Sequence, residues 1–318
     1  MSINFINTKT GNNLINDGHS LNDCMTGDQV AKIIDGIPRF VTIQANYAED
    51  FAWQWKKWGH SRNDDTGPRK FLLEEIIYRT KFDELDMTGK RILECGAGAG
   101  DDTEVLATMP FSEIHSFDLS TSIEEVRSQI QENRLTLSQA SILDIPYANE
   151  TFDVVYCHRV LQHTPDPVEA LVNICSKVKP GGVLFAHSYK RSLRNMIQWK
   201  YKYRWFTKRL PLSWVYKYVN SCGSFLHYIN KYLYKNTITM FFAYNFIPFY
   251  FSNRNDLSEP QKIEFEKLCT FDALIPEHDH PMTSKQFFGT IEKLGFEIVN
   301  KHDPKSSPLW CTAIKRMS

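Results

Sequence analysis

A glycine-rich stretch near residue 96 contains the residue types that point most directly to chemistry. A short apolar run ends in Glu94, and a helix-compatible segment begins at Asp101. Three glycines lie between them at alternate positions, Gly96, Gly98 and Gly100. Glycine has no Cβ, so a ligand can approach the backbone at such a turn. The next helix would begin with unpaired N–H groups. The pattern predicts a strand, a ligand-binding turn and a helix, which nicotinamide and flavin domains also use.

The next apolar run along the chain ends in an acidic residue, Asp118. A carboxylate at the tip of the neighbouring strand, about 20 residues beyond a glycine turn, can accept hydrogen bonds from ribose hydroxyls. The same side chain could instead cap the helix expected to begin near Thr121, and one carboxylate can do both. The spacing therefore indicates a nucleoside-binding edge of a parallel sheet.

Further motifs extend this alternation of strands and helices to residue 188. A third turn at residues 145–147 precedes a buried strand that begins at Phe152 and Asp153. The segment Leu-Gln-His-Thr-Pro-Asp-Pro then leads into a helix expected over residues 168–178. The residues Lys-Pro-Gly-Gly at 179–182 should stop that helix, and the next strand follows over residues 183–188.

As an ordered set, these motifs resemble the class I S-adenosylmethionine (SAM)-dependent methyltransferases, in particular their type 11 and type 12 groups. The resemblance spans roughly residues 88–188. It implies an α/β fold with a doubly wound, Rossmann-like, seven-stranded sheet, and SAM as the cofactor. The Phe-Asp strand start and the Lys-Pro-Gly-Gly stop are not expected in a dinucleotide-binding domain.

The resemblance also implies how the cofactor is held. Glu94 would hold the glycine loop and the methionine amino group, Asp118 would bind the ribose hydroxyls, and Leu119 would pack on the adenine. Where the family usually has an aspartate for the adenine amine, this chain has Ser141, whose oxygen can accept the same bond without a charge. An aromatic segment at residues 44–65 would close the methionine end, or would simply pack on the core. The full set of implied cofactor positions is Tyr47, Trp55, Arg62, Glu94, Gly96, Ala97, Gly98, Gly100, Asp118, Leu119, Ser141, Ile142 and Cys157.

Methyl transfer to an oxygen acceptor needs a base, because a protonated hydroxyl is a poor nucleophile. Histidine suits this role near neutral pH. The candidates are His163, His187 and His278, and His163 could equally be a structural residue at a helix start. Arg159, Tyr189 and His280 are the candidate substrate-binding residues. The pair His278 and His280, with Glu277 and Asp279 beside them, could suggest a metal, but no further ligands lie close in sequence and no metal is expected.

The chain is neutral as a whole, with 37 basic and 37 acidic residues, but its charge is unevenly distributed. Residues 170–255 contain fourteen Lys and Arg and no Asp or Glu, together with many aromatic residues. This points to a partner or substrate face. A helical lid over the acceptor, a membrane-interface surface through residues 199–251, or a homodimer surface would each fit. Nucleic acid is not expected, because no recognised nucleic-acid module accompanies the basic residues.

These patterns divide the chain into four parts: an N-terminal extension at 1–43, a SAM-binding core with a covering helix at 44–188, a helical lid or acceptor-binding insertion at 189–282, and a C-terminal helix and strand hairpin at 283–318. The extension ends like a small zinc ribbon. Only Cys24 and His19 could bind zinc there, so we expect a metal-free ribbon-like segment or a hairpin.

The seven cysteines occur singly, with no Cys-x-x-Cys pair, and the sequence has no signal-peptide pattern. Both features favour a protein of the reducing cytoplasm, which could also be peripheral to the membrane. The expected function is methylation of a small-molecule, sugar-like or glycan acceptor, anionic and methylated at oxygen. The alternatives are a membrane-peripheral methyltransferase of a lipid-linked or quinone-like acceptor, and a non-catalytic SAM-binding regulatory protein.

Overall fold

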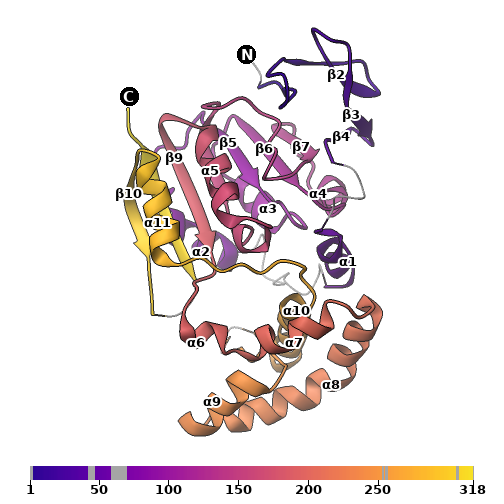
Figure 1. The fold of residues 1–318 in the computed structure, drawn as a ribbon, viewed down its shortest axis with the longest axis vertical. Helices are drawn as coiled ribbons and strands as arrows, with labels where there is room; N and C mark the ends of the chain where they lie inside the picture. Colours follow the sequence, from indigo (N-terminus) through magenta and orange to yellow (C-terminus); the bar gives the residue numbers. More distant parts are fainter. Residues whose placement is uncertain are drawn as a thin grey trace. The chain divides into compact units, whose positions relative to one another are not determined.

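The computed structural model describes residues 3–41, 47–58, 70–252, 254, 257–305 and 308–317, without the side chains of residues 70 and 71. The chain divides into two compact units (Figure 1). The sheet unit comprises Met1–Glu49, Asp65–Arg191 and His278–Ser318, and the helical unit comprises Asp50–Asp64 and Ser192–Glu277. Each unit is described by itself.

The sheet unit is built on one sheet with the strand order β1-β2-β3-β4-β7-β6-β5-β8-β9-β11-β10. Five neighbouring strands are parallel. They are β7 (Leu135–Gln139), β6 (Glu113–Asp118), β5 (Arg91–Cys95), β8 (Phe152–Cys157) and β9 (Val178–Ser188). Strand β11 (Leu309–Lys315) runs antiparallel to β9 and pairs with β10 (Phe296–His302) as the expected hairpin. The five parallel strands and the crossover connections between them place their carboxyl ends at one edge of the sheet, where ligands bind in such folds.

The prediction of seven strands is wrong for the sheet as a whole, which has eleven strands within the described residues. The N-terminal segment adds an antiparallel meander, and its last strand pairs in parallel with β7 through Arg39 and Gln139. The added strands are β1 (Leu14–Asn16), β2 (Ser20–Asp23), β3 (Gln29–Ile34) and β4 (Ile37–Arg39).

A buried carboxylate organises the start of this meander. Asp23 accepts five hydrogen bonds, from the side chains of Asn7, Thr10 and Asn12 and from the backbone N–H groups of Met25 and Thr26. These bonds lower the pKa of Asp23, with the Thr10 bond contributing most. Asp23 thus holds together the loop before β1 and the loop between β2 and β3.

Two hydrophobic clusters cover the two faces of the central strands. Side chains alternate across a strand, so Leu93 faces one cluster and Ile92 the other. Helices α5 (Pro167–Lys177) and α11 (Ser284–Lys293) contribute to the first cluster, and α2 (Lys70–Thr80) and α3 (Asp101–Ala107) to the second. The short helices α4 (Ile123–Gln129) and η3 (Leu161–His163) complete the unit.

The Lys-Pro-Gly-Gly motif at 179–182 follows the end of a helix, as predicted, but the next strand begins before residue 183. Helix α5 ends at Lys177, and β9 begins at once at Val178 and runs through the motif. The extra residues are accommodated by a register irregularity against β8, where Phe152 opposes Val178 and Val154 already opposes Val183. A Cβ at Gly182 would lie 2.9 Å from the Asp153 carbonyl oxygen, so this bulge requires a glycine.

In the part of the chain that the structure describes, the helical unit contains most of α1 (Glu49–Trp58) together with five further helices. They are α6 (Leu193–Met196), α7 (Trp199–Thr207), α8 (Leu212–Leu233), α9 (Thr237–Phe246) and α10 (Glu259–Leu274). Its core joins Trp58 and Trp199 to Val219, Leu268 and Phe271. Helix α10 packs against both α7 and α8. None of the helices in the described residues is both long enough and apolar enough to span a membrane.

The two segments that connect the insertion to the sheet unit are paired with each other. The backbone N–H of Arg191 donates to the Met282 carbonyl at 2.8 Å, and the N–H of Met282 donates to the Tyr189 carbonyl at 2.9 Å. The chain therefore leaves and rejoins the sheet unit at adjacent positions.

Candidate functional site

The glycine turn after β5 has the conformation that its sequence predicts. Gly96 has a φ of +86°, and a Cβ there would lie 2.2 Å from Cγ2 of Val160. The N–H groups of Gly96 and Ala97 both donate to the Phe117 carbonyl, at 2.8 and 3.0 Å. The turn is thus fixed against the end of β6, and residue 96 must be glycine for both steric and conformational reasons.

Glu94, the last acidic residue before the turn, is buried and only partly satisfied. One carboxylate oxygen, Oε2, accepts hydrogen bonds from Thr103 at 2.7 Å and Ser116 at 2.6 Å. The other oxygen, Oε1, is buried without a hydrogen-bond partner among the described residues. Burial raises the pKa of Glu94 to about 7, although the two hydroxyl bonds oppose the rise. A carboxylate oxygen held in this way is suited to a cationic ligand group, such as an ammonium.

Asp118 ends β6 and contacts the glycine turn directly. Its Oδ2 accepts the N–H of Gly98 at 2.9 Å, and its Oδ1 accepts the N–H and hydroxyl of Ser120. Burial raises the pKa of Asp118, and these bonds lower it in part. Tyr47 lies close enough to sense the Asp118 charge: burial, followed by that charge, raises the pKa of Tyr47 to about 12. The structure therefore brings together Gly98, Asp118 and Tyr47, which the sequence placed in one site.

Of the positions predicted to surround the adenine, some have polar groups that are already hydrogen-bonded and others have buried apolar side chains. The backbone carbonyl of Leu119 accepts a bond from Gln139 at 2.9 Å, and the Ser141 hydroxyl accepts the N–H of Leu143 at 3.1 Å. The side chains of Ile142 and Cys157 are buried in the hydrophobic core. Both side chains point into the sheet–helix interior, and their contact with the cofactor stays a prediction. Only their backbone groups could meet a ligand.

Two other predicted cofactor positions stay predictions. Trp55 lies in α1 within the helical unit, and Arg62 lies outside the described residues. Gly100, by contrast, precedes α3 with a φ of +93° and packs against Val126 and Ile130.

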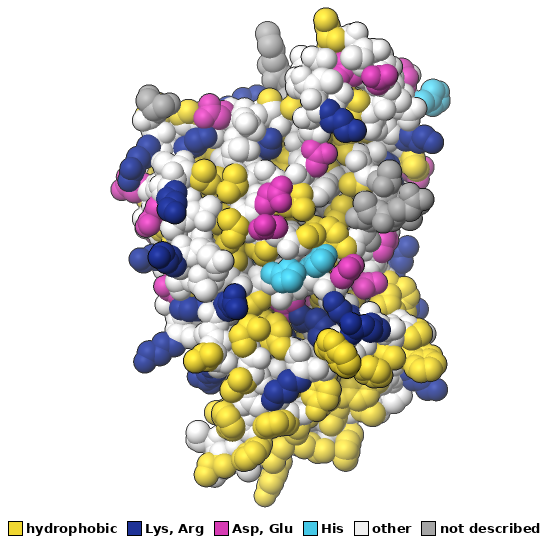
Figure 2. Space-filling view, viewed as in Figure 1, with side chains coloured by type: hydrophobic (Ala, Val, Ile, Leu, Met, Phe, Trp, Pro, Cys, Tyr) yellow, Lys and Arg dark blue, Asp and Glu magenta, His cyan; other side chains and the backbone are white. Residues whose placement is uncertain are grey.

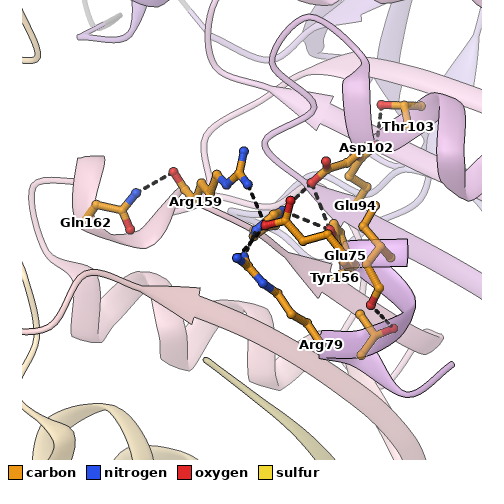
Figure 3. A network of polar contacts seen from close by, with 11 residues as sticks. Glu75, Arg79, Glu94, Asp102, Thr103, Tyr156, Arg159 and Gln162 are labelled. Carbon is orange, nitrogen blue, oxygen red and sulfur yellow. Dashed lines mark hydrogen bonds and ion pairs between the residues drawn. The ribbon is translucent and has the colours of Figure 1, made fainter. Parts of the chain in front are cut away.

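A network of charged and polar side chains lies beyond the turn, between α2, α3 and the end of β8 (Figure 3). Glu75 and Arg79 lie one turn apart on α2, and the Glu75 carboxylate also accepts a bond from Arg159 at 3.0 Å. Asp102 accepts bonds from the Tyr156 hydroxyl at 2.9 Å and from His158 Nδ1 at 2.6 Å. Although burial alone would raise the pKa of Asp102, His158, Arg159 and Tyr156 keep it well below its usual range.

The hydrogen bonds of His158 fix its protonation state. Its Nε2 lies 2.8 Å from an Arg79 guanidinium nitrogen, which can only donate, so Nε2 must carry the lone pair. Its proton is therefore on Nδ1 and faces Asp102. Burial, together with Arg159 and Arg79, lowers the pKa of His158, which agrees with a neutral ring. His158 is a fixed structural link and has no free lone pair with which to act as a base.

The turn that follows His158 is held in an unusual conformation. Arg159 has a φ of +63°, which non-glycine residues rarely adopt. Its carbonyl accepts a bond from the Gln162 side chain at 2.6 Å, and the Gln162 carbonyl accepts the N–H of His280 at 2.7 Å. Burial would lower the pKa of Arg159, but Glu75 and Asp102 leave it raised, so the guanidinium stays charged. Backbone strain of this kind is often found at functional sites.

The predicted acceptor-side residues gather around this turn. The ring of His163 lies 5.7 Å from that of Tyr189, and the ring of His278 lies 5.0 Å from Tyr47 and 5.5 Å from His280. His163 Nδ1 is 3.1 Å from the His278 carbonyl oxygen. Since a carbonyl can only accept, neutral His163 carries its proton on Nδ1 and its lone pair on Nε2.

His187, at the end of β9, differs from His163. It is buried, its ring lies 5.0 Å from that of His158, and its Nδ1 has no hydrogen-bond partner among the described residues. Burial and the nearby cationic and histidine groups place the pKa of His187 well below its usual range. A group that resists protonation so strongly is poorly suited to accept a proton from a substrate.

Sequence reasoning missed most of the network around Asp102. Glu75 and Arg79 have only the i, i+4 spacing of an ordinary helix pair as a signal, and α2 itself was not predicted. Among the described residues, no group of three or more His, Cys, Asp or Glu side chains is arranged to hold a metal ion.

Comparisons with known proteins agree with this geometry. Residues 93–186 match a protein-family model described as a methyltransferase domain. The ubiquinone biosynthesis O-methyltransferase of Actinobacillus pleuropneumoniae serotype 5b (strain L20) is 32% identical over 114 residues, which is 33% of this chain and 48% of that protein. The enzyme of the same name from Shewanella sp. (strain ANA-3) is 27% identical over 129 residues, 39% of this chain and 54% of that protein. The chain thus spans about half the length of the curated relatives it matches.

Among solved structures, the [4+2]-cyclase SpnF is similar to this chain with a TM-score of 0.51. The two are 14% identical, and the match covers 86% of this chain and 96% of that chain. This likeness concerns the fold alone.

Residues 93–186 therefore match a methyltransferase domain. Their glycine turn, acidic residues and strand order fit the predicted class I SAM-dependent methyltransferase fold, with SAM as its cofactor. The residues present fit this cofactor: Glu94 offers an unpaired buried oxygen for its ammonium group, Gly96 offers space, and Asp118 offers acceptors for its ribose.

Proposed function

We propose that this protein transfers the methyl group of SAM to an oxygen atom of a small, negatively charged acceptor, such as a carboxylate-bearing or phosphate-bearing aromatic or sugar-like molecule. The observation that carries the proposal is the fixed tautomer of His163, whose Nδ1–H is directed to the His278 carbonyl. Its Nε2 lone pair can then take the proton of a hydroxyl nucleophile. SAM, when bound, supplies a methyl group already activated by its sulfonium centre.

Arg159 supports an anionic acceptor. Its guanidinium gives one N–H to Glu75, its side chain is 40% exposed, and an arginine has five donors in a planar fork. Such a fork suits carboxylate and phosphate groups. The strained turn holds this donor next in the chain to the η3 helix that carries His163. Arg159 would therefore orient the acceptor while His163 removes its proton.

The roles of the remaining candidates follow from their contacts. Tyr47, whose ring meets His278 and whose hydroxyl stays protonated, would separate the cofactor side from the acceptor side. His278 would act as a positioning residue for His163. We do not assign proton transfer to His187, because its burial opposes protonation. The names of the matching relatives, which are O-methyltransferases, agree with oxygen as the accepting atom.

The test is methyl transfer by the full chain to a panel of hydroxybenzoates, sugar phosphates and their neutral analogues, with SAM binding measured separately by titration calorimetry. We expect His163→Ala to lower kcat by roughly 10²–10⁴-fold and to leave the SAM Kd unchanged. The variant should also lose the rise of kcat with pH that a neutral histidine base produces. Arg159→Met should raise KM for anionic acceptors only.

His302→Ala provides a matched control, because the ring of His302, in β10, stacks on Trp310 of β11. Full activity of the His163→Ala variant would refute the assignment of the base. SAM binding without methyl transfer to any acceptor class would instead favour a non-catalytic SAM-binding protein.

A further inference from the structure

Helix α8 of the helical unit has two opposite faces that serve different purposes. Val215, Val219, Gly223, His227 and Asn230 are buried, at spacings of three and four residues. The residues between them form an exposed stripe along the other face. This α8 stripe consists of Trp214, Lys217, Ser221, Phe225, Tyr228 and Tyr232, and the exposed Lys235 follows just beyond the end of the helix.

The aromatic members of the α8 stripe are exposed to an extent unusual for a water-facing helix. Trp214 is 66% exposed, Phe225 68% and Tyr232 73%. Helix α9 adds a second apolar row, with Ile238, Phe241, Phe242 and Phe246 all more than half exposed. Figure 2 shows these hydrophobic side chains gathered over α8 and α9, with Lys and Arg side chains among and beside them. Apolar patches of this kind mark interaction surfaces.

The charge of the same segment has one sign. Residues 192–255 contain ten Lys and Arg and no Asp or Glu. Basic side chains also lie over the aromatic rings, as Arg209 lies over Trp205 and Lys235 over Tyr232. The acidic residues of α10 are paired inside the unit, Glu259 with Lys231 and Glu264 with Lys267. Not every basic residue belongs to the surface: Arg204 is buried and donates to the Ala273 carbonyl.

We propose that the exposed faces of α8 and α9 form a docking surface for the headgroup region of an anionic phospholipid bilayer. Tryptophan, tyrosine and phenylalanine favour the membrane–water interface, where their rings are buried and their polar atoms stay hydrated. Lysine and arginine beside them are attracted to anionic headgroups. A second copy of the chain fits less well, because a symmetric contact would oppose two surfaces of the same positive charge.

The experiment is co-sedimentation of the full chain with vesicles of phosphatidylcholine alone and of phosphatidylcholine with phosphatidylglycerol. We expect binding to the anionic vesicles that weakens with salt. Each basic residue near the membrane contributes about fivefold in affinity. The triple variant K208Q/K217Q/K235Q, which also neutralises the exposed Lys208 at the end of α7, should therefore bind roughly 100-fold more weakly. A second variant, W214S/F225S/Y232S, should lose binding even at low salt.

Matched controls lie in the sheet unit. Lys32, Lys285 and Lys293 are exposed, so K32Q/K285Q/K293Q makes the same charge change elsewhere. Circular dichroism and SAM titration of every variant show that the fold and the cofactor site are intact, which separates this proposal from that of methyl transfer.

Three outcomes would overturn the proposal. The first is that the native protein does not bind the anionic vesicles, or that both triple variants bind them as the native protein does. The second is that light scattering shows a dimer which W214S/F225S/Y232S dissociates. The third is that the native protein binds single-stranded RNA and not the vesicles, and that the lysine variant loses this RNA binding.

Discussion

The substitution Glu94→Gln should raise the free energy of unfolding of the cofactor-free protein at alkaline pH and should weaken its binding of SAM. The pKa of Glu94 is raised from 4.5 to about 7 by burial. The folded protein therefore holds this proton more tightly than the unfolded chain, and ionisation of Glu94 opposes folding. The stabilisation that the protonated Glu94 contributes is fully present below pH 4.5 and is lost as the pH rises through 7. By linkage, the cost above pH 7 is about 3 kcal/mol.

Glutamine removes this ionisation with little change in shape. Thr103 and Ser116 both donate to the same oxygen of Glu94, so the amide oxygen of glutamine can accept both bonds. The amide NH2 then replaces Oε1, which has no partner, and a buried unpaired donor costs about 1–3 kcal/mol. At pH 8 the variant should range from equally stable to about 2 kcal/mol more stable. The difference between variant and native protein should grow by about 3 kcal/mol from pH 4.5 to pH 8.

The assay is urea unfolding of the cofactor-free protein at several pH values, with SAM titration of the same samples at pH 8. Loss of a charged hydrogen bond to the SAM ammonium should raise the Kd by roughly 10–150-fold. Glu297→Gln is the control, since Glu297 is exposed on β10. Parallel stability curves for the two proteins across this pH range would refute the burial argument. An unchanged Kd would refute the ammonium contact.

Other parts of the structure give predictions of the same kind. Gly96→Ala should destabilise the protein by about 2–5 kcal/mol, because residue 96 has a positive φ and a Cβ there would clash with Val160. In thermal unfolding, the double variant with Val160→Ala should regain the stability lost to the clash. Purely additive losses in the double variant would contradict the clash. His227→Ala should lower the stability of the helical unit by about 3 kcal/mol, because fully buried His227 is hydrogen-bonded to Glu266 at 2.7 Å. Thermal unfolding followed by circular dichroism of the helices measures this loss. A loss no larger than that of the control Ser221→Ala would count against the prediction. Asp23→Asn should loosen the N-terminal meander. Because the pKa of Asp23 is lowered, its stabilisation is present above about pH 4 and disappears at lower pH. Hydrogen exchange of the meander should lose that pH dependence in the variant, and retention would contradict it.

The fold could be predicted from the sequence wherever a short local pattern, such as a helix N-cap, has a general structural meaning. The helix start at Asp166, with its side chain accepting the N–H groups of Val168 and Glu169, follows from an N-cap followed by proline. The C-terminal hairpin, β10 and β11, lies within the segment 283–318 in which it was predicted. The meeting of Gly98 with Asp118 could also be predicted, because parallel neighbouring strands end at the same edge.

Features that depend on contacts between distant segments could not be predicted in this way. The network around Asp102 joins residues from α2, α3 and β8, and no spacing in the sequence links residue 75 to residue 159. The role of Asp23 depends on three side chains of an irregular loop. Arg204 reads as a surface cation in the sequence, yet it binds a carbonyl at the end of α10. In each case the sequence contains the polar group but does not indicate which partner it meets.

The paired backbone at Tyr189–Arg191 and Met282 has a consequence for how this fold could vary. Because the chain departs and returns at hydrogen-bonded neighbours, the segment between them closes a loop whose ends are already together. The entropy of closing a longer or shorter loop there changes only slowly with its length. An insertion at such a place can therefore be lengthened, shortened or exchanged between proteins without changing the register of β9 and β11. One methyltransferase core could in this way be combined with many different acceptor-side or surface-binding segments.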